Sequence, residues 1–275
     1  MESAILILAG FIIGTCGTLI GAGGGFILVP LLLIFYPQLG PELTTAISIA
    51  VVALNAISGT VAYARSGRID YSAGLVFAAY TIPGSILGVI TVKYIPKELF
   101  NVIFGFLLLA LAVYLFLKNK KNIGGLVMPS PTNGRRQHVL IDSEGTTYRY
   151  CYNSIYGNII SIIVGYISPL LGIGGGIIHV PAMVNWLKFP VRVATATSHF
   201  ILAVMATVSV ITHTFQGTYK SPETVHMILF LAIGVVPGAQ LGAMLSHKIK
   251  SHVILQVLAG CLVIVGIRIL MSNIK

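Results

Sequence analysis

The sequence predicts an all-α, polytopic membrane protein built from two homologous repeats, and three observations support this fold class. First, 56% of the 275 residues are hydrophobic and only 9% are charged, with a mean hydropathy of +0.94. A soluble domain has about 25% charged residues, so this composition cannot cover a water-exposed surface. Second, apolar segments follow one another along the chain. Third, a glycine-rich motif and the landmarks around it occur twice.

Most of the apolar segments approach the ~20 residues that a membrane-spanning helix needs. The two that follow the glycine runs, 25–36 and 176–187, are too short to span alone. We therefore expect a first transmembrane repeat at 1–118, a linker at 119–151 and a second transmembrane repeat at 152–275. The apolar segments lie at residues 4–20, 25–36, 43–64, 73–92, 98–118, 152–171, 176–187, 193–215, 223–246 and 250–272.

The repeat is visible as a series of landmarks in the same order. GAGGGFILVP at 21–30 returns as GIGGGIIHVP at 172–181, about 150 residues later. Two copies of a multi-helix unit are typical of transporters. The other matched landmarks are Thr45–Ser48 with Thr195–Ser198, Gly67 with Gly217, Pro83-Gly84 with Pro237-Gly238, and Gly88 with Gly242.

The orientation of the two repeats depends on how the chain passes each glycine run. If each run is the tip of a re-entrant hairpin, each half has about three further spanning helices and the halves are inverted. If each pair of short segments makes one broken crossing, the halves are parallel. The inverted arrangement collects slightly more Lys and Arg residues on one face, as the positive-inside rule favours. It places the N-terminus outside and residues 119–151 in the cytoplasm.

The linker has a character of its own. Residues 122–134 are rich in Gly, Pro, Ser and Asn, which indicates a flexible loop. Residues 138–152 alternate apolar and polar side chains around Ser143-Glu144-Gly145, which predicts a β-hairpin. A structured cytoplasmic loop is the simpler interpretation of this hairpin, and a regulatory or partner-binding role is the alternative.

The glycine runs predict helices that begin inside the membrane. The proline of each motif falls near the first turn, where it is tolerated, and the free N–H groups before it favour negative charge. Small residues for close helix packing are the alternative explanation. A nucleotide site would need a βαβ unit that is not visible. The predicted anion-binding residues are Gly23, Gly24, Gly25 and Phe26, with Gly174, Gly175, Gly176 and Ile177.

These motifs resemble the TauE/SafE family of sulfite and sulfonate exporters, also called the TSUP family. GAGGGFILVP, TTAISIAVVALNAISG and IPGSILG carry the resemblance in the first half, and GIGGGIIHVP, VATATSHF and VVPGAQLG carry it in the second. It covers nearly the whole chain except 119–151. The resemblance implies the movement of small, often sulfur-containing anions, and it leaves the substrate of this chain open.

Polar side chains near the centre of each repeat are further candidates. Their hydroxyl, amide or imidazole groups suit an oxyanion, and bonding within the helices is the alternative. Pro83, Gly84, Pro237 and Gly238 are candidate hinges, or static kinks. The candidate substrate-binding side chains are Thr45, Ser48, Asn55, Thr195, Ser198, His199 and His179.

We therefore expect a secondary transporter that exports a small, sulfur-containing oxyanion, with an anion channel of the same architecture as the alternative. The acidic residues all lie at segment ends or in loops, which disfavours a cation pump. The expected partners are the anion, the lipid bilayer, a proton as coupling ion and a second copy of the chain. No cofactor, metal, nucleic acid or enzymatic chemistry is expected, because the basic residues lie between apolar runs and no catalytic motif is present.

Overall fold

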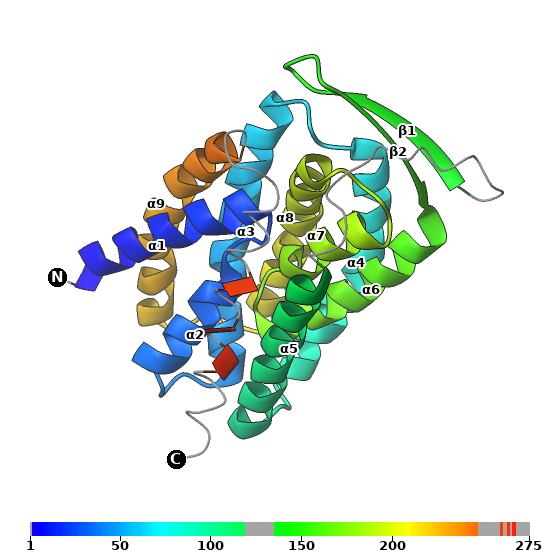
Figure 1. Ribbon diagram of the computed structural model, residues 1–275. Coiled ribbons are helices and arrows are strands. Elements are labelled where there is room, and N and C mark those ends of the chain that lie inside the picture. Colours follow the sequence, from blue (N-terminus) through cyan, green and yellow to red (C-terminus); the bar gives the residue numbers. More distant parts are fainter. Residues whose placement is uncertain (1, 119–134, 247–258, 261–262, 265, 268–275) are drawn as a thin grey trace.

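A computed structural model describes residues 2–118, 135–246, 259–260, 263–264 and 266–267 (Figure 1). The predicted loop at 122–134 and most of the predicted segment at 250–272 lie outside these residues. The elements are α1 (Glu2–Ile20), α2 (Gly25–Phe35), α3 (Pro41–Arg65), α4 (Tyr71–Val92), α5 (Lys97–Lys118), β1 (Arg135–Ile141), β2 (Thr147–Asn153), α6 (Ser154–Leu171), α7 (Gly176–Asn185), α8 (Val191–Phe215) and α9 (Pro222–Leu245).

The helices form a multi-pass membrane protein. Within the described ranges, six helices are long and apolar enough to cross a bilayer: α1, α3, α4, α6, α8 and α9. Large apolar side chains on their outer faces, such as Leu8, Leu75 and Ile233, are exposed, as expected for surfaces that face lipid. In contrast, α2 and α7 have 11 and 10 residues and reach only about 16 Å. Both are too short to span, as the sequence predicts.

The two halves exchange their helices. Helix α1 of the first half packs along α9 of the second, and α6 of the second half packs along α4 of the first (Figure 1). Helices α3 and α8, which occupy matching positions in the two repeats, pack against each other between these pairs. Each contact of one half therefore has its counterpart in the other, as in a two-fold symmetric dimer.

Glycines permit the close approach of these exchanged helices. A Cβ atom at Gly84 of α4 would collide with the backbone of Ile162 in α6, and one at Gly238 of α9 would collide with the backbone of Phe11 in α1. Such small residues at helix interfaces are typical of membrane proteins. Both helices continue unbroken past Pro83 and Pro237. The four candidate hinge residues thus lie at packed crossings, and movement at them stays a prediction.

Helices α3 and α8 run antiparallel, as contacts at the two ends of α3 indicate. Beyond its C-terminal end, the backbone N–H of Asp70 donates to Thr197 Oγ1 near the start of α8 (3.0 Å). At its N-terminal end, Tyr219 Oη, which follows α8, donates to Ala46 O (2.9 Å). The matching loops 66–70 and 216–221 therefore lie at opposite ends of the helical bundle.

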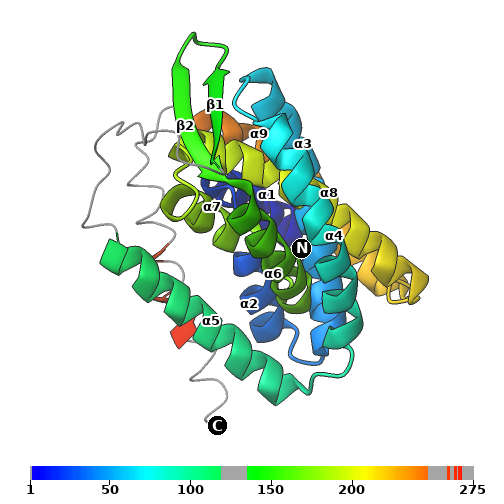
Figure 2. The same cartoon turned by 90° about the vertical axis from the view of Figure 1, so that its right-hand side faces the viewer.

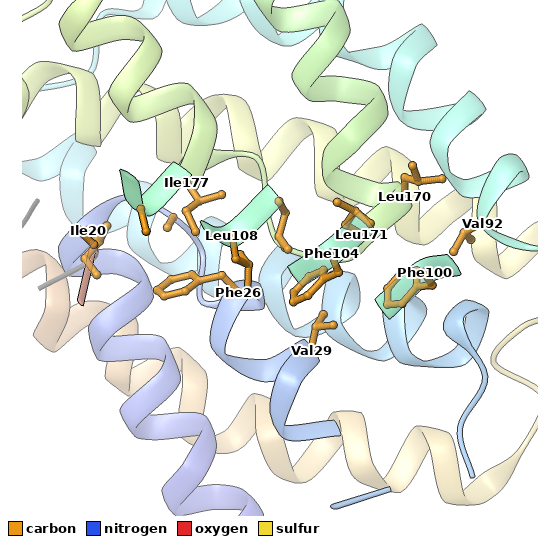
Figure 3. Close-up of a cluster of buried hydrophobic side chains, with 14 residues drawn as sticks. Ile20, Phe26, Val29, Val92, Phe100, Phe104, Leu108, Leu170, Leu171 and Ile177 are labelled. Carbon is orange, nitrogen blue, oxygen red and sulfur yellow. The ribbon is translucent and has the colours of Figure 1, made fainter. Parts of the chain in front are cut away.

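One of the two large apolar clusters includes side chains of both short helices (Figure 3). Phe26 and Val29 from α2 and Ile177 from α7 meet Phe104 and Leu108 from α5, all fully buried. Helix α5 lies on the flank of the bundle in Figure 2. Burial of these side chains holds the two short helices in place, because neither short helix can cover its own apolar surface.

Strands β1 and β2 form the predicted hairpin. They pair antiparallel from Arg135 opposite Asn153 to Ile141 opposite Thr147, with Asp142–Thr146 between them. Figure 2 shows the hairpin at one end of the bundle, directly before α6. Ser143 N–H donates to Ser66 O in the α3–α4 loop (3.0 Å). We call this the hairpin end of the molecule.

Candidate functional site

The glycine runs adopt backbone conformations that favour glycine. Gly21, Gly23 and Gly24 have φ between +78° and +85°, and Gly172 and Gly174 have φ of +67° and +73°. These left-handed conformations are strained for residues with a Cβ atom. They turn the chain sharply between α1 and α2 and between α6 and α7, and the two short helices begin at Gly25 and Gly176.

The two turns contact each other. A Cβ atom at Gly25 would overlap the carbonyl oxygen of Gly172, and one at Gly176 would overlap the carbonyl oxygen of Gly21. The contact is thus reciprocal, as the exchange of helices between the halves requires. Thr195 of α8 contacts Gly21, and Thr45 of α3 contacts Gly172 in the same way. The structure therefore brings the two predicted glycine sites together.

Each turn leaves backbone N–H groups unpaired at the start of its short helix. Among the described residues, no hydrogen bond engages the N–H groups of 24–26 in the first turn or 174–176 in the second. The next N–H groups are already paired: Ile27 N–H donates to Gly24 O (3.0 Å) and Ile178 N–H to Gly175 O (3.1 Å). Of the predicted residues, Gly23 and Ile177 also have paired N–H groups, since Gly23 N–H donates to Gly17 O (3.1 Å) and Ile177 N–H to Gly174 O (3.4 Å).

The four candidate hydroxyls differ in their hydrogen bonds. Thr45 Oγ1 donates to Glu42 O (3.0 Å) and Thr195 Oγ1 to Val191 O (2.9 Å), so both satisfy their own helix. Ser48 Oγ donates across the interface to Gly172 O (2.6 Å). The buried Ser198 Oγ has no partner among the described residues. Of this set, Ser198 has the hydroxyl that remains available for a ligand.

Asn55 and His199 belong to one buried cluster, and both are fully buried. Thr18 Oγ1 donates to Asn55 Oδ1 (2.9 Å) and lies 3.2 Å from His199 Nε2. With the Thr18 proton directed to Asn55, the Thr18 hydroxyl accepts from Nε2 in the tautomer that carries its proton there. His199 Nδ1 and Asn55 Nδ2 have no partner among the described residues. Buried polar atoms without partners are rare in proteins and call for an explanation.

Tyr63 completes this cluster. Its ring packs edge-on against the His199 imidazole with 5.7 Å between centroids, and its hydroxyl donates to Thr18 O (2.8 Å). The other candidate histidine, His179, lies apart on α7 with Nε2 3.4 Å from Ser161 Oγ.

The sequence reasoning missed Thr18 and Tyr63. A polar residue three positions before the first glycine run was the available signal for Thr18, and its pairing with α8 was not visible in the sequence.

A second set of polar residues, also missed, joins the hairpin to the α3–α4 loop. Arg68 is 1% exposed, and its Nε lies 3.3 Å from Asp142 Oδ2. Burial alone would raise the pKa of Asp142. The hydrogen bonds that its carboxylate accepts from Thr146, Tyr148, Glu144 and Arg68 outweigh burial and lower the pKa instead. The carboxylate therefore stays ionised and paired with Arg68 at neutral pH.

Asp70 also fixes the α3–α4 loop through hydrogen bonds to its carboxylate. Its carboxylate caps α4 by accepting from Ala73 N–H (3.0 Å) and also accepts from Tyr150 Oη (2.6 Å). His138 Nδ1 lies 3.1 Å from the same carboxylate. Burial, together with this carboxylate, raises the pKa of Tyr150. The hairpin is thus docked through buried polar contacts. Within the described ranges, no group of three His, Cys, Asp or Glu side chains is arranged to hold a metal ion.

Comparison with known proteins identifies the family. A family model described as "Sulfite exporter TauE/SafE" matches residues 6–269. The chain belongs to the TauE/SafE family. A TauE/SafE chain is a membrane transporter rather than an enzyme, and the resemblance noted in the sequence is confirmed.

Similar proteins in other organisms are named as transporters. A "Probable membrane transporter protein YunE" of Bacillus subtilis is 31% identical, over 100% of this chain and 99% of its own length. A "Probable membrane transporter protein MJ0441" of Methanocaldococcus jannaschii is 24% identical, over 97% of this chain and 95% of its own. No solved structure matches this TauE/SafE chain.

Proposed function

We propose that this transporter exports a small, sulfur-containing oxyanion through a site formed by the two glycine turns and the cluster around His199. One observation carries the proposal: polar atoms of three residues predicted from the sequence, Asn55, Ser198 and His199, are buried without partners. The N–H groups that begin α2 and α7 are unpaired among the described residues as well. Neutral donors of this kind suit an oxyanion, because they stabilise negative charge without adding a fixed countercharge.

The proposal includes inverted repeats with re-entrant hairpins. Three features support it: α3 and α8 run antiparallel, the equivalent loops 66–70 and 216–221 lie at opposite ends, and α2 and α7 are too short to cross. A two-fold axis in the membrane plane relates such halves. The two glycine turns then meet near the middle of the bilayer, where both faces can gain access in turn.

The distribution of basic residues supports the direction of transport. The hairpin end carries Arg65, Arg68, Arg149, Lys188 and Arg192, whereas the described loops of the opposite end carry Lys93, Lys97 and Lys220. An excess of Lys and Arg in short loops marks the cytoplasmic side. Movement from the hairpin end to the opposite end is therefore export.

His199 is our candidate for proton coupling. Its Nδ1 is an acceptor while the ring is neutral and becomes a donor when the ring is protonated. A proton and an oxyanion can therefore stabilise each other at this position. Ile49 occupies the matching position of the first repeat, so the molecule has one such group on one side of its two-fold axis.

The test is flux through the full chain reconstituted in liposomes. We expect saturable flux of sulfite, thiosulfate or a sulfonate that increases with an imposed pH gradient, and no such flux in protein-free vesicles. Carboxylates and halides are the comparison anions. Flux that rises linearly with anion concentration and ignores the pH gradient would favour the channel. The proposed function is wrong if none of the sulfur oxyanions moves faster than in protein-free vesicles.

A further inference from the structure

A small recess opens at the hairpin end and is lined by Arg68, Val191, Arg192, Thr195 and Ser246. We propose that this arginine recess is a second binding site for the transported oxyanion, and that Glu144 of the hairpin is a tethered carboxylate that competes with the anion for Arg68. The inference rests on the proposed function for its substrate. The recess lies apart from the glycine turns and uses fixed positive charge in place of neutral donors.

The two carboxylates on Arg68 are held differently. Asp142 is fixed, because it also accepts hydrogen bonds from the N–H groups of Glu144 (3.0 Å) and Thr146 (2.8 Å) and from Tyr148 Oη (3.1 Å). Glu144 places Oε2 3.3 Å from Arg68 Nη2, but its side chain is 56% exposed. Exposed ion pairs are weak because water competes for both charges. The contact of Arg68 with Glu144 is therefore the weaker of the two, and it is the contact with which an oxyanion competes.

The recess is joined to the glycine turns through two residues. Thr195 lines the recess and also contacts Gly21 of the first turn. Tyr63 has Arg68 and Ser246 among its electrostatic neighbours, and its hydroxyl donates to Thr18 O in the His199 cluster. Thr195 and Tyr63 therefore connect the recess with the first glycine turn and with the cluster around His199.

The matching position at the opposite end has the opposite charge. Within the repeat, Arg192 aligns with Glu42, Arg68 with Thr218, and Thr195 with Thr45. Thr218 Oγ1 donates to Glu42 Oε1 (3.2 Å), so these two residues also meet. The recess thus holds two arginines where the matching position of the opposite end holds Glu42 and Thr218. Asp142 and Glu144 neutralise Arg68 within the recess, so its positive charge becomes available to an oxyanion when Glu144 leaves it.

Uptake of radiolabelled sulfite into inside-out membrane vesicles tests the recess, because the hairpin end then faces the bath. Glu144→Gln should lower the half-saturating concentration about threefold, and Arg192→Gln should raise it about tenfold, as expected for one charge-assisted hydrogen bond. Arg192→Lys should fall between Arg192→Gln and the wild type, since it keeps the charge but loses the fork geometry. Glu98→Gln and Arg65→Gln remove the same charges outside the recess and should behave like the wild type.

Thermal stabilisation of the purified chain by sulfite or sulfate tests the recess independently of flux. We expect stabilisation at lower anion concentration for Glu144→Gln and at higher concentration for Arg192→Gln. If all variants are stabilised at the same anion concentration, the recess is overturned, even where transport is normal. If the wild-type chain shows no flux but the variants shift the stabilising anion concentration as expected, the recess stands and only the proposed function is contradicted.

An anionic lipid headgroup shares the chemistry of the substrate. The vesicle measurement is therefore repeated in phosphatidylcholine with and without phosphatidylglycerol. The substrate assignment predicts the same order of variants in both lipids. An effect of Arg192→Gln that appears only with phosphatidylglycerol would assign the recess to lipid and overturn the proposal.

Discussion

The two halves of the molecule agree at their glycine turns and differ around them. Gly25 and Gly176 make the same contact with the opposite turn, and Gly84 and Gly238 make the same contact with the exchanged helix. Around the turns, however, aligned positions of the two repeats carry different residue types: Asn55 aligns with Met205 and His199 with Ile49. The matched glycines make the same packing contacts in both halves, whereas the unmatched residues Asn55 and His199 belong to the site that we propose.

This asymmetry has a direction. Thr18, Asn55, Tyr63 and His199 gather on the side of the turns that faces the hairpin end, while their counterparts are Pro169, Met205, His213 and Ile49. The site that we propose therefore presents different side chains to the two ends of the molecule. We expect the four tests below to separate scaffold from chemistry.

The largest expected effect concerns the inverted relation of the halves. With Cys16, Cys151 and Cys261 replaced by serine, we introduce Ser143→Cys at the hairpin or Lys220→Cys in the α8–α9 loop. An impermeant maleimide should label Lys220→Cys on intact cells and Ser143→Cys only after permeabilisation. Tyr94→Cys, at a position 76% exposed after α4, should behave like Lys220→Cys. Labelling of Ser143→Cys and Lys220→Cys from one side would break the comparison.

Next in size is the contact between the turns. Gly176→Ala should abolish flux, because its Cβ atom overlaps Gly21 O and separates the two turns. Gly25→Ala should do the same from the other half. Gly40→Ala is the matched control, since a Cβ atom there meets nothing within 4 Å. Flux and membrane insertion are measured together, and a wild-type rate in Gly176→Ala would refute a role for the contact.

A smaller effect is expected at His199. His199→Gln should reduce the flux driven by a pH gradient about tenfold, as expected for one hydrogen bond to a charged group, and leave insertion unchanged. His226→Gln, at an exposed position of α9, is the control. If His199→Gln keeps its full response to the gradient, coupling does not pass through this histidine.

The smallest effects should distinguish Ser198 from its counterpart Ser48. Ser198→Ala should raise the half-saturating anion concentration a few-fold and leave the melting temperature unchanged, because Ser198 Oγ has no protein partner. Ser48→Ala should lower the melting temperature by about 2–4 °C, because Gly172 O loses a buried hydrogen bond. The reverse pattern would show that Ser198 is structural.

Much of the fold was predictable because it depends on local pattern. The apolar segments, the short helices after the glycine runs and the β-hairpin follow from hydropathy, spacing and alternation. The sequence also singles out Asn55, Ser198 and His199 as candidates, since polar residues are conspicuous in apolar segments, and their role stays a prediction. Thr45 and Thr195 looked equivalent to them, but their hydroxyls bond to their own helices. Only the structure distinguishes a satisfied hydroxyl from an unpaired one.

The rest depends on contacts between distant parts of the chain. Arg68 and Asp142 are separated by 74 residues, and both belong to loops that the sequence suggests are exposed. Their burial results from the docking of the hairpin on the α3–α4 loop, which no local pattern reveals. The orientation of α8 against α3 was likewise uncertain, because the charge bias favoured the inverted arrangement only slightly.

The exchange of α1 and α6 between the halves has a consequence for the origin and assembly of the chain. Helix α1 packs against glycines of α9, and α6 packs against glycines of α4, so each lies against the other half. One half made alone therefore lacks the surface against which its first helix packs. The architecture corresponds to a domain-swapped homodimer whose two subunits have been fused head to tail. Under the inverted relation that we propose, two unfused halves of this kind would insert in opposite orientations before they could pair.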